Sequence, residues 1–159
     1  MANINTNTDQ GEINYDICEK QGEIYEYMAS SGYDIKQFSN LFLSSGFCND
    51  CFDKCWSLYH DASPYESFYE KMEPEFGDRL TKYDDDKIFD IDAAYWIGFT
   101  YRQLAIETLI PSKELLHIIP FDELAGCYPG LHTVAEEYAT DIICEYHKLT
   151  KHPDTEVKA

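Results

Sequence analysis

Basic residues are scarce in this sequence. Its 159 residues include 12 lysines and arginines against 30 aspartates and glutamates, which gives a formal net charge of −18 at pH 7. A field of that sign repels nucleic acid and anionic membranes, and it attracts basic surfaces. The composition therefore argues against direct nucleic-acid binding. It favours a protein partner with a basic surface, or a solvated acidic exterior without such a role.

Long apolar runs are also missing. The nearest candidate, residues 91–110, is interrupted by Asp92, Arg102 and Glu107, so we expect no membrane span. The first residues carry neither the basic region nor the apolar core of a secretory signal, which predicts a cytoplasmic protein with reduced thiols. Glycine-rich phosphate loops and a G-x-S-x-G nucleophile motif are absent too, and we expect no cofactor.

Strand-like alternation of apolar and polar residues is absent, whereas helical periodicity recurs through the chain. We therefore predict an all-α fold, an irregular or orthogonal bundle of six to eight helices. The bundle should form a single domain over residues 14–150. Residues 1–13 are polar and rich in Asn and Thr, and we expect them to be disordered. We expect residues 151–159 to form a flexible tail.

The predicted centre of the bundle is a helix over about residues 92–109, because apolar residues occupy nearly every side of it. Asp90 or Asp92 is its expected N-cap. Gly98 lies in its middle, where glycine costs about 1 kcal/mol relative to alanine, and so predicts a close crossing with another helix.

Capping residues predict further helices. Asp34 precedes Gln37 by three residues, and Thr133 precedes Glu136 by three, which is the spacing of a capping box. A Pro-Gly pair at 129–130 predicts a turn before the last helix. That helix should bury a stripe made of Ala135, Tyr138, Ile142, Tyr146 and Leu149.

Three of the six cysteines cluster at positions 48, 51 and 55, and His60 follows them. On a helix expected over about 47–59 these cysteines share one face, and free cysteine behaves as a small buried hydrophobe. A structural zinc site normally has two ligand pairs, and only one Cys-x-x-Cys is present. We interpret Cys48, Cys51 and Cys55 as a core stripe. A metal site with His60 as the fourth ligand, or thiol chemistry, are the alternatives.

Arg102 lies in the most apolar segment of the chain. A buried arginine needs a carboxylate, so we expect an internal ion pair. The alternative is that Arg102 reaches a surface pocket and orients a partner. The densest acidic stretch contains Asp84, Asp85 and Asp86, and we nominate these three together with Arg102 and His132 as candidate partner contacts.

Three segments carry a resemblance to other proteins: YWIGFTYRQL at 95–104, PSKELLHIIP at 111–120 and YPGLHTVAEEYA at 128–139. The chain resembles small uncharacterised acidic helical proteins of Firmicutes whose genes lie near those of ADP-ribosyltransferase-like toxins. The likeness spans roughly residues 24–145 and implies an antitoxin or accessory role. The matching residues are Trp96, Gly98, Tyr101, Arg102, Ser112, Lys113, Glu114, Leu131, His132 and Thr133.

The charge, the 13 tyrosines and the resemblance together predict a non-enzymatic binding protein. The most concrete form is an antitoxin-like inhibitor that covers a basic, nucleotide-binding surface of a toxin. One alternative is a nucleic-acid mimic such as an anti-CRISPR protein. Another, from a different class, is a zinc- or thiol-dependent enzyme that uses the cysteine cluster.

Overall fold

The computed structural model describes residues 6–54, 66–83, 89–153 and 155–158. Within these ranges the chain is all-helical, as predicted, with an isolated bridge between Tyr33 and Lys82 and no strand. None of the helices in this part of the chain is long and apolar enough to cross a membrane. The elements are α1 (Thr6–Ser30), α2 (Ile35–Leu43), α3 (Gly46–Cys48), a π-helical turn η1 (Asn49–Asp53), α4 (Glu66–Phe76), a 3₁₀ turn η3 (Gly77–Arg79), α5 (Ile91–Thr108), α6 (Ser112–Ile118), α7 (Phe121–Leu131) and α8 (Glu136–His147).

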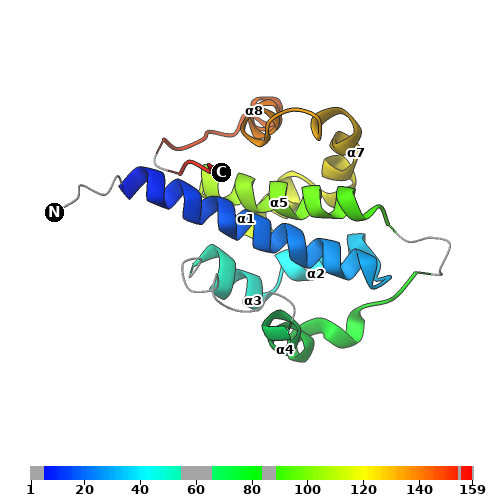
Figure 1. Ribbon diagram of the computed structural model, residues 1–159. Coiled ribbons are helices and arrows are strands. Elements are labelled where there is room, and N and C mark those ends of the chain that lie inside the picture. Colours follow the sequence, from blue (N-terminus) through cyan, green and yellow to red (C-terminus); the bar gives the residue numbers. More distant parts are fainter. Residues whose placement is uncertain (1–5, 55–65, 84–88, 154, 159) are drawn as a thin grey trace.

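Two long helices form the centre of the molecule. Figure 1 shows α1 and α5 side by side, with α7 and α8 on one side of the pair and α2, α3 and α4 on the other. Most residues of α5 are buried, which confirms the predicted central helix. The Asp90 carboxylate accepts a hydrogen bond from the backbone N–H of Ala93 at 3.0 Å, so Asp90 is the N-cap.

Glycine on each central helix allows the close approach of α1 and α5. A Cβ atom on Gly98 would lie 2.7 Å from the ring of Tyr25 and 2.8 Å from the carbonyl oxygen of Gln21. On α1, a Cβ atom at Gly22 would lie 2.9 Å from the ring of Tyr95. The crossing predicted from Gly98 is therefore confirmed, and Gly22 is its counterpart on the facing helix.

The first and last segments of the chain were predicted to be disordered or flexible, but their described residues pack against each other. α1 begins at Thr6, well inside the segment expected to be disordered, and the C-terminal tail lies against it. The side-chain amide of Asn14 donates to the carbonyl oxygen of Glu156 at 2.9 Å, and the backbone N–H of Lys158 donates to the carbonyl oxygen of Gly11 at 3.1 Å. The two polar segments satisfy each other's hydrogen-bonding groups, and composition does not reveal such a pairing.

The boundary between the last two helices also differs from the prediction. α7 continues through Pro129 and Gly130, where a turn was expected. Proline keeps a helical φ, and near the end of a helix its missing N–H removes only one hydrogen bond. α8 begins at Glu136 with Ala135 as its N-cap, so the start predicted at Thr133 is wrong.

The face that α8 buries is not the predicted one. Tyr138 and Tyr146 are 59% and 78% exposed, and Ile142 is exposed as well. Residues at positions i, i+1, i+4 and i+5 face the core instead, which is another face of the helix than the predicted stripe. The buried residues of α8 are Ala139, Thr140, Ile143 and Cys144.

Candidate functional site

Five of the candidate site residues lie outside the described part of the chain. They are Asp84, Asp85 and Asp86 of the acidic stretch, and Cys55 and His60 of the cysteine cluster. Their roles as partner contacts or metal ligands stay predictions. The remaining candidates lie at two sites beside α5, one around Arg102 of α5 and the other around His132, which follows α7.

Arg102 forms the internal ion pair that its apolar surroundings predict. Its side chain is 1% exposed, and Nη1 donates to the Asp53 carboxylate at 2.6 Å. Nε donates to Gln21 Oε1 at 2.8 Å, and Nη2 donates to Ser112 Oγ at 2.7 Å. The ring of Phe52 lies 5.3 Å from the guanidinium carbon. The buried charge therefore joins α1, η1, α5 and α6, and it has little surface to offer a partner.

Asp53 is the second centre of this network. One carboxylate oxygen accepts the hydroxyl of Ser112 at 2.7 Å as well as the Arg102 guanidinium, and the other accepts the backbone N–H of Ser112 at 3.1 Å. Three donors therefore converge on this one carboxylate, and the bond from the guanidinium is charge-assisted. Asp53 therefore both neutralises Arg102 and anchors the first turn of α6.

The cysteine cluster begins in the same place. The expected single helix over 47–59 is replaced, as far as the structure describes it, by α3 and the π-helical turn η1. Cys48 and Cys51 are buried, as a core stripe requires, and Cys48 Sγ accepts from Arg102 Nη2 at 3.2 Å. Burial raises the pKa of the Cys48 thiol to about 11, against the opposing effect of Arg102. Cys48 is therefore a protonated thiol at neutral pH, which is a weak nucleophile and a weak metal ligand.

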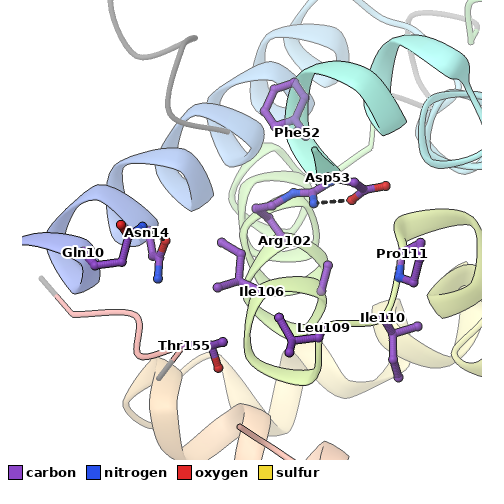
Figure 2. A pocket seen from close by; sticks show the side chains of 11 residues that line it. Gln10, Asn14, Phe52, Asp53, Arg102, Ile106, Leu109, Ile110, Pro111 and Thr155 are labelled. Atoms are coloured by element: carbon purple, nitrogen blue, oxygen red, sulfur yellow. Dashed lines mark hydrogen bonds and ion pairs between the residues drawn. The ribbon is translucent and has the colours of Figure 1, made fainter. Parts of the chain in front are cut away.

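Across the described ranges, no group of three or more His, Cys, Asp or Glu side chains is arranged to hold a metal ion. A pocket of about 190 Å³ does open beside the Arg102 network (Figure 2). Ile106, Leu109 and Pro111 form its apolar wall, and Asn14 and Thr155 lie across from them. Its volume is below the range of about 300–1,000 Å³ typical of pockets for drug-sized ligands.

His132 lies at the second place, a surface hollow of about 280 Å³ between α1, α5 and α7. Each of these helices contributes to it, and His132 follows the last residue of α7. We call this site the aromatic hollow. Its lining residues are Glu26 of α1, Asp92, Tyr95 and Trp96 of α5, Tyr128 of α7, and His132.

Packing holds the rings of the aromatic hollow in fixed orientations. Tyr128 meets Trp96 edge to face, with ring centroids 5.8 Å apart, and it stacks on His132 at 4.3 Å. The Nδ1 atom of His132 lies 2.6 Å from the carbonyl oxygen of Tyr128, which fixes the imidazole. Tyr95 sits against Gly22, whose missing side chain leaves room for its ring on α1. The rings thus contact one another and form one wall of the hollow.

Carboxylates surround these rings. Asp92 is exposed and Glu26 is partly exposed. Burial is the main cause that raises the pKa of Tyr128 above its ordinary value, and the negative charges of Asp90 and Asp92 add to it. Neither lysine nor arginine is among the described residues that line the hollow. Among the described residues, the site therefore combines aromatic faces with acidic side chains.

Reasoning from the sequence found only His132 in this hollow. Local signals for the rest were present, because Asp92, Tyr95 and Trp96 are spaced i, i+3 and i+4 on one helix, and Tyr128 precedes His132 by four residues. Each of these sets shares a helix face. Only the packing of α5 against α7 and α1 brings the two sets and Glu26 together.

No protein-family model, curated protein or solved structure matches this chain.

Proposed function

We propose that this chain is a non-enzymatic acidic binding protein that docks on the basic surface of a protein partner. The observation that carries the proposal is the aromatic hollow with its acidic rim, on a chain of net charge −18. Tyrosine, tryptophan and arginine dominate the energetics of protein interfaces, and charge complementarity governs the rate of association. The hollow supplies rigid aromatic area, and the chain as a whole supplies the field.

Several of the chain's few positive charges are paired with its own carboxylates. Five of the described cations form such ion pairs: Lys36, Lys54, Arg102, Lys151 and Lys158. An excess of acids therefore remains for the surface. Such a surface attracts a basic partner over about 8 Å at physiological ionic strength, which is the screening length there.

The more specific form of this proposal is an antitoxin-like inhibitor. The resemblance to proteins encoded near ADP-ribosyltransferase-like toxins supports it, and a basic surface that binds an anionic nucleotide is a fitting target for an acidic protein. A nucleic-acid mimic would carry the same charge, and the two are separated by the identity of the partner. Thiol chemistry at the cysteine cluster is the alternative of another class, and at Cys48 it is disfavoured because burial raises the pKa of that thiol to about 11.

The test is affinity purification of the tagged full chain from its native host at low ionic strength, followed by identification of the bound protein. We expect a partner with a strongly basic surface that is released by salt, and reconstitution of the pair from purified components. An ADP-ribosyltransferase-like partner whose activity falls on binding would establish the inhibitor. A reconstituted partner with an acidic surface, or binding that is indifferent to salt, would contradict the proposal. Stoichiometric zinc in metal-replete protein would favour the metal-dependent alternative.

A further inference from the structure

We propose that the aromatic hollow binds a single arginine side chain of the protein partner. This inference rests on the proposed function and adds the chemical group that the site recognises. Three features of the hollow carry it: the faces of its rings, the carboxylates at its rim, and its size.

The rings supply a surface for a cation. The faces of aromatic rings carry partial negative charge, and a guanidinium placed within about 6 Å of a ring centroid is attracted to it. Trp96 and Tyr128 supply such rings, with His132 stacked on one face of Tyr128. The two rings are already locked edge to face at 5.8 Å, so binding does not have to immobilise them. Tryptophan is the best ring for such a contact, and here it is partly buried and packed against the core.

The carboxylates select the charge and the shape of the ligand. Asp92 and Glu26 come from different helices, α5 and α1, and line the same hollow. A guanidinium is planar, so it can lie against a ring and still direct N–H groups from its edge toward carboxylates. A lysine ammonium is a compact charge that is more strongly hydrated than a guanidinium and lacks its planar fork, so it gains less from such a site. The pairing of flat rings with rim carboxylates therefore favours arginine over lysine.

The size of the hollow favours one side chain over a cofactor. At about 280 Å³ it lies just under the range of about 300–1,000 Å³ that encloses drug-sized ligands, and it is a surface site. An arginine at the tip of a partner loop can enter such a site while the rest of the partner stays outside. We therefore assign the hollow to an arginine of the partner and not to a free small molecule.

The test uses nuclear magnetic resonance of the full chain, with Nα-acetyl-arginine amide as the probe. The signal is the indole N–H resonance of Trp96, assigned with a Trp96→Phe variant. We expect a saturable shift with a dissociation constant on the order of millimolar, since a single exposed cation–π contact is weak. Nα-acetyl-citrulline amide, which has the shape of arginine without its charge, should give no comparable shift. Nα-acetyl-lysine amide and choline should bind more weakly than the arginine probe.

Two variants remove the two features separately, and each has a matched control on α8. Tyr128→Leu removes a ring, and Tyr146→Leu removes an exposed tyrosine outside the hollow. Glu26→Gln removes a rim carboxylate, and Glu145→Gln removes an exposed one elsewhere. We expect the hollow variants to weaken binding of the arginine probe about threefold or more, and the controls to leave it unchanged. Glu26→Gln keeps the size of the side chain, so it tests the site even if Tyr128→Leu disturbs the fold.

An absent Trp96 shift, an equal response to citrulline, or tighter binding of lysine or choline would overturn the arginine assignment. The reconstituted partner separates this failure from failure of the proposed function. If the partner binds with a steep salt dependence, and Tyr128→Leu and Glu26→Gln leave its affinity unchanged, the arginine assignment is wrong. The proposal of an acidic binding protein is then still supported. If association ignores salt, the proposed function itself fails.

Discussion

The guanidinium of Arg102 shows how one residue organises its surroundings. It donates to Asp53, Gln21 and Ser112 from the middle of the central helix. Transfer of a charge from water into a protein interior costs several kcal/mol, and the pair is stable only while both partners are present. The network thus ties Arg102 to residues that are 10, 49 and 81 positions away in the chain.

The first prediction concerns this pair. Arg102→Ala should lower the free energy of unfolding by about 3–5 kcal/mol, because it leaves Asp53 partly buried without its partner. Urea denaturation followed by circular dichroism measures the loss. Arg79→Ala is the matched control, since Arg79 is exposed, and it should change stability by less than about 0.5 kcal/mol. An Arg102→Ala variant of normal stability that fails to bind the partner would make Arg102 a contact residue.

The second prediction concerns pH and Glu107. Burial raises the pKa of its carboxyl above the ordinary value, although Lys151 at 3.5 Å and the Thr140 hydroxyl at 2.9 Å oppose the effect. A raised pKa means that the folded state favours the protonated form. The stability contributed by this group is complete below its unfolded pKa and is lost as pH rises through the folded pKa.

The Glu107→Gln variant has no carboxyl at this position, so it does not lose this stability as the pH rises. The difference in unfolding free energy between the variant and the wild type should therefore move in favour of the variant as pH rises from about 4 to 7. Chemical denaturation of both proteins across this range measures it, with Glu145→Gln as a control at an exposed position. A difference that is constant with pH, or one that moves toward the wild type, would contradict the assignment.

At the scale of helices, the reciprocal glycines decide how closely α1 and α5 pack. Gly98→Ala should lower the unfolding free energy by about 1–3 kcal/mol, because its Cβ would lie under 3 Å from the Tyr25 ring and from a backbone oxygen. This loss occurs although alanine is the better helix former by about 1 kcal/mol. Gly126→Ala in α7 is the control, since a Cβ there meets nothing within 4 Å and should stabilise slightly. If both variants are equally stable, the close crossing is not a constraint.

The elements that could be predicted from the sequence are those fixed by local chemistry. The central helix and the caps at Asp34 and Asp90 depend on residues within a few positions of one another. The crossing on α1 was indicated by one local feature, a glycine in the middle of the central helix. The buried face of α8 could not be predicted, because it depends on which side of the helix fits against α5. The same holds for the tail, which is held by hydrogen bonds to α1 across the whole length of the chain.

The candidate site divides in the same way. The ion pair of Arg102 could be predicted, because an arginine buried in an apolar helix needs a carboxylate partner. Its partner Asp53 could not be identified among the 30 acidic residues of the sequence. His132 was nominated from the sequence, but the rings and carboxylates beside it come from three helices. Pairwise contacts of this kind depend on the tertiary fold.

At the scale of the whole molecule, the excess of 18 negative charges is the property on which the account depends. Replacement of Asp84, Asp85 and Asp86 by lysine would change the net charge from −18 to −12, since each of the three exchanges raises the net charge by two. Long-range attraction acts on the rate of encounter and much less on the rate of dissociation. A partner that is attracted by this negative charge should therefore associate more slowly with the triple variant than with the wild type.

The measurement that tests the central claim most directly is the association rate constant of the purified partner as a function of ionic strength. The screening length falls from about 8 Å at physiological salt to about 3 Å at 1 M, so we predict a steep fall in the association rate with a much smaller change in the dissociation rate. The triple lysine variant should have a lower association rate constant at low salt, and that rate constant should decrease less as the salt concentration rises. An association rate that is flat from low to high salt, and equal for the wild type and the triple variant, would contradict the account.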